Sequence, residues 1–265
     1  MEGFKLIYVD SNRQIIEMNS EYIALREKAE ERTELYHFCK LSDLNNILKT
    51  KSLLLSNLNN FSGSGEYEKS GIDTNFLGCV FISSLTHCKN SKNLWNDFGD
   101  NGKGVKLTFS YSGIFHNEVF DQAEKVKAYS KDKTLLAEYG FSVSCVKAKQ
   151  LVCLPNYSTD IIVDLILSDV IYSNSEPVST VCLNNDKLLN LSNVSRTVLQ
   201  HYNDEFETRM IGILRSTKEI CIADISYLLV PLDFSKFELK LEFGNKVNTE
   251  VRTEYIRFLN NIRMT

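Results

Sequence analysis

The chain has few of the residues that break or separate folded units. Only three prolines occur among 265 residues, and no stretch has the composition of a low-complexity linker. Hydrophobic residues make up 43% of the chain and aromatic residues 11%, which excludes global disorder and allows a sizeable core. Since neither linkers nor internal repeats are present, we expect a single domain over residues 1–265, with residues 1–33 as an N-terminal helical extension.

The sequence also lacks long apolar runs. The richest, Ile161–Leu167, is interrupted by Asp164 and is far shorter than the roughly 18 residues that a membrane helix needs. The opening MEGFKLIYVD has an early glutamate and lacks the basic-then-apolar order of a secretory signal. These absences predict a cytoplasmic protein with no membrane partner.

The cysteines form no C-x-x-C pair. Their odd number and irregular spacing favour reduced, mostly buried thiols over disulfides. Cys79, His87 and Cys88 lie close together, but their spacing matches no standard zinc pattern and no second pair follows them. No metal is therefore predicted.

The hydrophobic pattern predicts an α+β fold. Strands and helices do not alternate regularly, which argues against a doubly wound parallel sheet. Between two of the strands lies a long loop over 57–75, rich in Gly, Ser and Asn, of the kind that often serves as a lid. The expected strands are 34–40, 53–55, 78–84, 104–111, 206–215, 219–225 and 237–243, and the expected helices are 12–32, a short one from Ser42, 159–172, 187–203 and 249–262.

Familiar catalytic signatures are missing. The sequence contains no G-x-S-x-G, no G-K-[ST] phosphate loop, no H-E-x-x-H and no G-x-G-x-x-G. The segment Gly99–Gly104, GDNGKG, looks like a phosphate loop, but it precedes a strand where a helix N-terminus would be needed. An ordinary turn is the alternative interpretation of that segment.

Three segments taken together resemble a known bacterial family. They are Leu35–Phe38, then Val80–Ser84 running into Leu94–Phe98 and Gly102–Val105, and finally Tyr202–Met210, and their most specific part reads LWNDFGDNGKGVKLTF. The family is a domain of unknown function whose members read Y-H-Y, then M-W-x-x-Y-A with K-G-V, then E-W-R. This chain departs from the pattern at Thr208, where the family has an aromatic residue. That family is in turn similar to the ADP-ribosyltransferase fold, including toxins that modify DNA or RNA.

The resemblance implies a mixed or antiparallel split sheet with flanking helices, ADP-ribosyltransferase-like, and it nominates His37 and Glu207 as catalytic residues. NAD would be the substrate rather than a resident cofactor. Cleavage of its nicotinamide–ribose bond builds an oxocarbenium-like sugar, as in glycoside hydrolysis. A carboxylate such as Glu207 can bind a ribose hydroxyl, favour the developing positive charge and accept a proton from the nucleophile. His37 would bind the other ribose.

Five further residues are implied in NAD binding. Ser83 and Ser84 would hold a ribose or the carboxamide, because hydroxyl groups both donate and accept hydrogen bonds. Tyr36 or Trp95 would stack on the cationic nicotinamide ring, with Phe98 as a further alternative. Arg209 would anchor a phosphate.

Each of these residues also has a purely structural interpretation. His37 fits a hydrogen-bonded core histidine, and Glu207 fits a surface ion pair with Arg209 or Lys218. Trp95 fits a core aromatic residue, and Ser83 with Ser84 fits the end of a strand. The remaining histidines, His87, His116 and His201, carry no motif and are interpreted as structural.

The function that the resemblance implies is an NAD-dependent ADP-ribosyltransferase that modifies a macromolecule, as a toxin or phage-defence effector. An antitoxin or chaperone would be a partner. The alternatives are an NAD glycohydrolase with water as acceptor, and a non-catalytic binding module. The formal net charge of −4 excludes a generally basic nucleic-acid binder but not a local basic patch. RNA or DNA is favoured as the target because lysines and aromatics are interleaved in one stretch: Lys103, Lys106, Lys125, Lys127, Lys131, Lys133, Lys147 and Lys149 with Phe109, Tyr111, Phe115, Phe120, Tyr129 and Tyr139.

Overall fold

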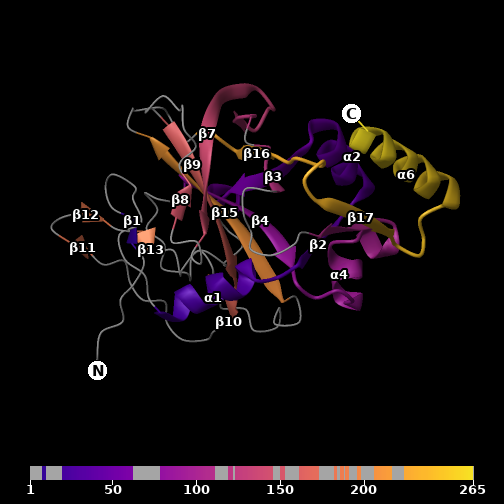
Figure 1. Cartoon of the computed structure of the whole chain (residues 1–265), viewed down its shortest axis with the longest axis horizontal. Helices are drawn as coiled ribbons and strands as arrows, with labels where there is room; N and C mark the ends of the chain where they lie inside the picture. Colours follow the sequence, from indigo (N-terminus) through magenta and orange to yellow (C-terminus); the bar gives the residue numbers. More distant parts are fainter. Residues whose placement is uncertain are drawn as a thin grey trace.

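Strands dominate the architecture seen in a computed structural model of the chain (Figure 1). The structure describes residues 8–9, 20–61, 78–110, 119–121, 123–145, 150–152, 161–172, 182–183, 186–187, 189–190, 196–197, 206–216 and 224–264.

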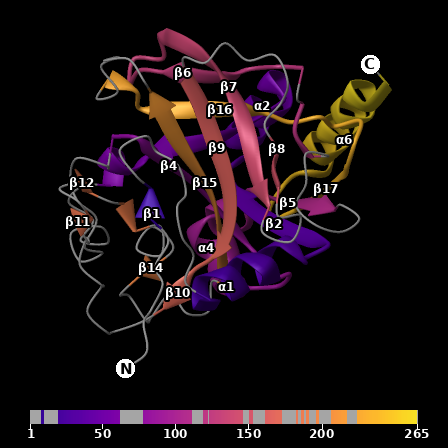
Figure 2. The same cartoon turned by 60° about the vertical axis from the view of Figure 1, so that its left-hand side comes forward.

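Seven strands close into a barrel. Hydrogen-bonded neighbours follow the order β15-β9-β7-β6-β16-β3-β4, and β4 pairs again with β15 (Figure 2). Within this ring β7 and β9 run parallel, and the other neighbouring pairs are antiparallel. The barrel strands are β3 (Ser52–Asn57), β4 (Val80–Thr86), β6 (Val126–Tyr129), β7 (Leu135–Cys145), β9 (Ile161–Asp169), β15 (Glu207–Ser216) and β16 (Tyr227–Pro231).

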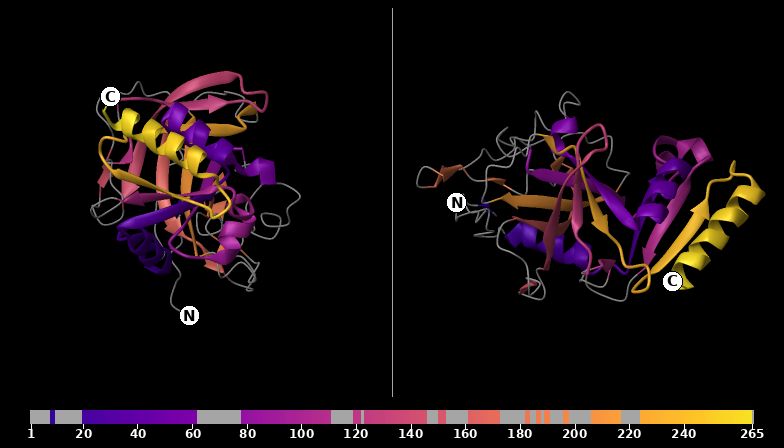
Figure 3. Two further views of the ribbon diagram at one scale, coloured as in Figure 1. Left: turned by 90° about the vertical axis from the view of Figure 1, so that its right-hand side faces the viewer. Right: turned by 90° about the horizontal axis from the view of Figure 1, so that it is seen from above.

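A three-stranded extension leaves the barrel at β4. It consists of β2 (Glu34–Cys39), β5 (Val105–Ser110) and β17 (Glu238–Phe243), in that order. Helix α6 (Thr249–Met264) lies beside β17, where Tyr255 contacts Phe243 and donates a hydrogen bond to the Leu41 carbonyl oxygen (Figure 3). The remaining elements are α1 (Ser20–Glu30), α2 (Leu41–Thr50), η1 (Leu58–Phe61), α4 (Lys92–Asp97), η2 (Asp100–Gly102), β1 (Tyr8–Val9), β8 (Gln150–Val152), β10 (Ile171–Tyr172), β11 (Cys182–Leu183), β12 (Asp186–Lys187), β13 (Leu189–Asn190) and β14 (Arg196–Thr197).

The expected α+β, ADP-ribosyltransferase-like split sheet is wrong. A split sheet needs an open seam, whereas β4 and β15 pair continuously from Glu207–Thr86 to Ile213–Val80 and close the ring. The helix expected over 159–172 is instead strand β9. Its residues 163–170 are all buried, since side chains on one face fill the barrel and those on the other lie against neighbouring elements such as α1. A largely apolar run of this length, interrupted by Asp164, fits a buried strand as well as a helix.

Other expectations divide in the same way. The helix expected over 187–203 is wrong where the structure describes it, because Leu189–Asn190 and Arg196–Thr197 are strand residues. The strand expected over 104–111 exists as β5, but it is not half exposed, since even Lys106 is buried. Helices expected at the two ends of the chain appear as α1 and α6, although α1 is shorter and residues 10–19 lie outside the described part.

The GDNGKG segment is a turn that lets three backbone stretches pack together. Gly102 has a φ of +82°, in the left-handed region that side chains rarely adopt. A Cβ on Gly104 would lie 2.3 Å from the Cys39 carbonyl oxygen, and the Gly244 amide donates to the Gly104 carbonyl oxygen at 3.0 Å. The segment leads into β5 and not into a helix, so the phosphate-loop alternative finds no support in its geometry.

Within the described part of the chain, no helix combines the length and the apolar character needed to cross a membrane.

Candidate functional site

The closing seam of the barrel brings three nominated residues together. Ser84 on β4 lies directly opposite Arg209 on β15, with Glu207 two residues away on the same strand. The Ser84 hydroxyl donates to Glu207 Oε1 at 2.5 Å. Arg209 donates to both carboxylate oxygens, from Nε at 2.9 Å and from Nη2 at 3.1 Å. Glu207 is therefore held in one orientation by three hydrogen bonds.

Strand alternation explains why these side chains meet. Residues two apart on a strand point to the same face, so Glu207 and Arg209 share a face of β15 with Ser84 of the paired strand. Met210 and Gly212, further along β15, belong to the other face. There a Cβ on Gly212 would contact Leu55 and Val163 inside the barrel. The cluster therefore lies on the outer wall of the barrel.

Burial within the cluster is uneven. Arg209 is 2% exposed and Glu207 is 8% exposed, whereas Ser84 is exposed. A buried ion pair carries a large desolvation cost that its hydrogen bonds must offset. Since the serine reaches solvent and touches the carboxylate, it marks the side from which a ligand can approach Glu207.

His37 joins the cluster through the backbone. Its Nδ1 lies 3.0 Å from the Ser84 carbonyl oxygen, beside the single residue pair, Tyr36 with Thr86, that joins β2 to β4. Although the His37 side chain is only half-buried, desolvation by the surrounding protein disfavours its charged form and lowers the pKa of the imidazole. This effect outweighs the Ser84 hydrogen bond and the Asp43 carboxylate, which raise the pKa. The ring is therefore neutral at neutral pH, and Nδ1 acts as the donor to the carbonyl oxygen.

A neighbouring polar network was not found from the sequence. At the end of β9, Asp169 accepts hydrogen bonds from the Thr208 hydroxyl at 2.8 Å and from Arg32 Nη2 at 2.7 Å, and His87 Nδ1 lies 3.3 Å from the Thr208 hydroxyl oxygen. His87 was interpreted as structural, and Asp169 fell in an expected helix. Only the pairing of β9 with β15, which is not a local signal, brings these residues together.

Three nominated residues lie elsewhere. Ser83 is adjacent to Ser84 in sequence but is buried on the opposite face of β4, opposite Met210. Tyr36 and Trp95 belong to a separate apolar cluster with Phe38 and Leu94, in which Trp95 packs edge-on against Phe38 at 5.0 Å. Burial raises the pKa of Tyr36, whose hydroxyl donates to Glu34 at 2.6 Å. These contacts support the structural interpretation of Tyr36 and Trp95.

The structural interpretation of Glu207 is confirmed in one respect and wrong in another. Glu207 does pair with Arg209, at 2.9 Å, but the pair is buried and not on a solvated face. Lys218, the other proposed partner, lies outside the described residues, as do His116 and His201. Most of the proposed lid over 57–75 also lies outside them.

Comparisons with protein-family models, curated proteins and solved structures gave no match.

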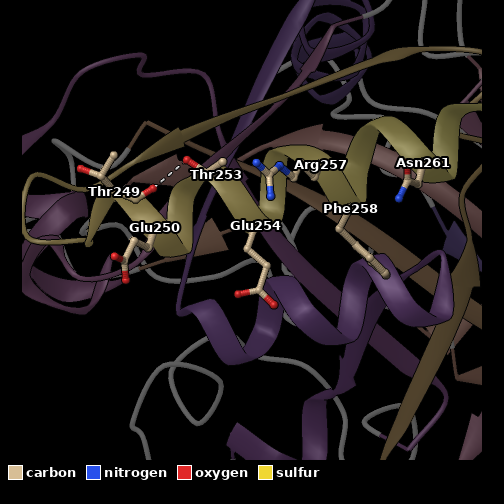
Figure 4. A pocket seen from close by; sticks show the side chains of 7 residues that line it. All are labelled: Thr249, Glu250, Thr253, Glu254, Arg257, Phe258 and Asn261. Atoms are coloured by element: carbon tan, nitrogen blue, oxygen red, sulfur yellow. Dashed lines mark hydrogen bonds between the residues drawn. The ribbon is translucent and has the colours of Figure 1, made fainter.

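A recess on the described surface lies along α6, away from the cluster (Figure 4). All its lining side chains come from that one helix, on which the Thr253 hydroxyl donates to the Thr249 carbonyl oxygen at 2.9 Å, so it is a shallow surface feature. The described residues contain no group of three or more His, Cys, Asp or Glu side chains placed to hold a metal ion. Cys39, Cys79 and Cys88 form no disulfide bond, and burial raises the pKa of Cys39.

Chemically, the cluster offers an oriented carboxylate with an exposed hydroxyl beside it. A carboxylate fixed in this way can stabilise an adjacent positive charge or accept a proton without first reorganising. Arg209 fixes the orientation of Glu207 through two parallel hydrogen bonds. The arrangement suits a reaction in which positive charge develops on a sugar.

Proposed function

We propose that this chain is an NAD-consuming glycosyl-transferring enzyme, an ADP-ribosyltransferase that modifies a macromolecule, with RNA or DNA favoured over protein. One observation carries the proposal: residue 84 and the neighbouring residues 207 and 209, all nominated by resemblance and 123 positions apart in sequence between 84 and 207, form one hydrogen-bonded cluster with an exposed edge. In this proposal the protein acts in the cytoplasm as a toxin or phage-defence effector, held in check by an antitoxin or chaperone.

The proposed chemistry assigns one role to each residue of the cluster. Glu207 accepts a hydrogen bond from a hydroxyl of the nicotinamide-bearing ribose, in place of the one that Ser84 now donates, and its charge favours the oxocarbenium-like sugar. The glycosidic electron pair leaves with nicotinamide, which becomes neutral. A nucleophile on the acceptor then forms the new bond to the sugar carbon, and Glu207 accepts the proton that the nucleophile loses. Arg209 keeps the Glu207 carboxylate oriented, and His37 holds the Ser84 backbone.

The first experiment uses adenylate-labelled NAD and a lysate separated into protein, DNA and RNA. Label in one fraction, lost in Glu207→Gln, supports the transferase and names its target class. The matched control is Glu238→Gln, because Glu238 is an exposed glutamate on β17 that also pairs with a cation two residues away on its own strand, Lys240.

A second variant protects the test against simple unfolding. Glu207→Gln leaves the buried Arg209 without its counter-ion, whereas Ser84→Ala keeps the ion pair and removes only the exposed hydroxyl. We expect Ser84→Ala to fold normally, as checked by thermal unfolding, and to label the acceptor more slowly, because it lacks the hydroxyl that would hold a ribose or the carboxamide of NAD. Free ADP-ribose without labelled macromolecule would indicate the glycohydrolase instead.

A non-catalytic binding module is the second candidate function. The observation that favours it is that both carboxylate oxygens of Glu207 already have partners within the chain. Unchanged NAD in the presence of every fraction of the lysate would establish this alternative and remove the catalytic roles assigned to the cluster.

A further inference from the structure

Two partly exposed tyrosines stack on each other where the β6–β7 hairpin meets β16. Tyr129 on β6 and Tyr227 on β16 lie directly opposite each other, with ring centroids 5.2 Å apart and ring planes 8° from parallel. Both side chains are half-buried, so part of each ring reaches solvent on the outside of the barrel. The hairpin and β16 lie together at the top of Figure 2.

The pair forms part of a row of register partners across four strands. In register, Leu135 of β7 lies next to Tyr129, at a β-bulge, and Ser56 of β3 lies next to Tyr227. Ser56 is the smallest side chain of the row, and at the other end Leu135 is 46% exposed. The two partly exposed tyrosine rings are therefore flanked in the row by a small polar side chain on one side and by an exposed leucine on the other.

Four lysines lie on or next to β6, within four residues of Tyr129 in the chain. Lys127 shares the outer face of β6 with Tyr129, since Val126 and Ala128 between and beside them are buried. Lys125, Lys131 and Lys133 are exposed, the last two in the turn of the hairpin. Among the described residues no carboxylate forms an ion pair with these four lysines.

The acidic residues nearby reduce the positive charge but do not cancel it. Residues 124–138 contain the four lysines and three acids, Glu124, Asp132 and Glu138, which leaves one net positive charge on a chain of net charge −4. Asp132 is engaged within the turn, where it accepts hydrogen bonds from the Ser130 hydroxyl and from the Thr134 amide. Glu138 lies opposite Lys127 in register. The hairpin thus combines a partly exposed tyrosine ring, on which a base can stack, with lysine side chains that reach solvent.

The sequence suggested a longer nucleic-acid-binding stretch of interleaved lysines and aromatics, and the structure leaves only part of it available for binding. Lys106, Phe109, Phe120 and Tyr139 are buried and cannot reach a ligand. Tyr111, Phe115, Lys147 and Lys149 lie outside the described residues. What remains is the hairpin, to which the fold adds Tyr227 from nearly 100 residues further along the chain.

We propose that Tyr129, Tyr227 and the lysines around them form a docking surface for single-stranded nucleic acid, in which a base stacks on the tyrosine pair and the lysines bind the adjacent phosphates. Base-on-aromatic stacking beside a cationic groove is the general mode of single-strand recognition. A duplex buries its base faces and offers no such partner. The surface names the acceptor class for the activity proposed above and rests on that proposal for this link alone, because binding requires no NAD.

Binding is measured by fluorescence anisotropy with an end-labelled single-stranded oligonucleotide of about 12 nucleotides. We expect binding at low salt, weaker binding of the matching duplex, and a log–log salt slope set by the number of neutralised phosphates. Tyr129→Ala and Tyr227→Ala should each weaken binding about tenfold or more, whereas Tyr129→Phe, which keeps the ring, should bind normally.

The lysine contribution has a matched control on the chain. The triple variant Lys127→Gln, Lys131→Gln, Lys133→Gln should lower the salt slope by about 2, since each single-strand phosphate contact contributes roughly 0.7. The control triple, Lys236→Gln, Lys240→Gln, Lys246→Gln, changes the same charge at exposed lysines near β17 and should leave the slope unchanged.

Three outcomes would overturn the proposal. They are unchanged anisotropy at low salt, an equal loss of binding in both lysine triples, and binding that Tyr129→Ala and Tyr227→Ala do not weaken although they remain folded by circular dichroism. A surface for a protein partner would be the interpretation left. Binding is measured without NAD, so failure of the docking surface is distinguishable from failure of the NAD chemistry.

Discussion

Two ion pairs of this protein contain a buried cation but are built in opposite ways. Lys106 is 1% exposed and pairs with Glu242 at 2.6 Å, while its Nζ also donates to the Lys89 carbonyl oxygen and lies 5.4 Å from the centre of the Tyr36 ring. Its partners come from β17, from the segment after β4 and from β2. Glu207 and Arg209 are both buried and are neighbours on a single strand.

The difference indicates what each pair is for. Lys106 connects three separate elements, and the carboxylate that balances its charge is in solvent, so the pair contributes to holding the extension together. The Glu207–Arg209 ion pair lies within one strand and is tied to β4 by the Ser84 hydroxyl, and both of its members bear the desolvation cost. It therefore carries a larger desolvation cost than the Lys106–Glu242 pair, whose carboxylate stays in solvent.

Removal of one partner should separate the two pairs most clearly. Arg209→Met leaves a nearly buried carboxylate without its counter-ion, so we expect the free energy of unfolding to fall by about 3–5 kcal/mol. Lys106→Met leaves Glu242 in solvent and should cost at most about 2 kcal/mol. Urea unfolding of both variants measures the contrast. An equal or larger cost for Lys106→Met would reverse the interpretation.

The aromatic partner of Lys106 gives a finer test. Tyr36→Leu removes the ring under the ammonium group and should cost about 1–2 kcal/mol, whereas Tyr36→Phe keeps the ring and should stay within about 1 kcal/mol of the wild type. Thermal unfolding monitored by circular dichroism measures both variants. If Tyr36→Phe is as destabilised as Tyr36→Leu, the lost stability comes from the hydrogen bond of the Tyr36 hydroxyl to Glu34 and not from the ring beneath Lys106.

The pH dependence of stability sharpens the view of the region around Glu207. Burial is the largest cause that lowers the pKa of His37 and of His87 below the ordinary value of 6.5, and for His87 the Arg32 and Lys28 charges add to it while Asp169 opposes it. As the pH falls below 6.5 the unfolded chain takes up protons first, so the free energy of unfolding decreases. Above that pH neither histidine contributes a slope.

Urea unfolding across a pH series measures this slope, and His37→Gln and His87→Gln should each flatten it. Glu34 acts in a lower window, because its hydrogen bond from Tyr36 is the largest cause that holds the pKa of this carboxyl below 4.5. A profile that is flat between neutral pH and 5 would show that both imidazoles are as easily protonated in the folded protein as in the unfolded chain.

An exposed pair provides the baseline for the comparison. Glu238 and Lys240 are also two apart on one strand, at 3.1 Å, but their side chains are 57% and 53% exposed. We expect Glu238→Gln to change the free energy of unfolding by less than about 0.5 kcal/mol. A larger change would mean that same-strand pairs stabilise this sheet even when water surrounds them.

Local pattern predicted several elements well. The alternation of apolar residues predicted β5 and β17, and the helical spacing of Leu44, Ile47 and Leu48 predicted the buried face of α2. Ser42, the expected cap of that helix, instead lies inside it, since the N-cap is Lys40. Strand β17 and helix α2 were predictable because each buries one side only, and β5 kept its alternating pattern although both of its faces are buried.

The barrel was not predictable in the same way. Strand β9 is buried along residues 163–170, so its residues carry no period, and β6 with β7 falls in a stretch for which no element was expected. Closure depends on the pairing of β15 with β4 and β9, far apart in sequence.

The site was predicted in part. Motif resemblance nominated Ser84, Glu207 and Arg209, which do meet, but it could not separate Ser84 from Ser83, whose side chains point to opposite faces of one strand. It also grouped Tyr36 and Trp95 with the site, although their packing places them in another cluster. Which face of a strand a residue occupies follows from register, and register was not visible in the motifs.

The seam between β4 and β15 also sets an order of events during synthesis. Strand β4 ends at Thr86, whereas its partner is complete only at Ser216, so the edge of β4 waits without that partner while the residues between the two strands are made. Contacts so distant in sequence form late and slow the folding of a chain. Ser84 and Glu207 lie on this seam, and they can meet only after both strands have left the ribosome. A nascent chain of this protein therefore carries no assembled cluster until β15 has emerged.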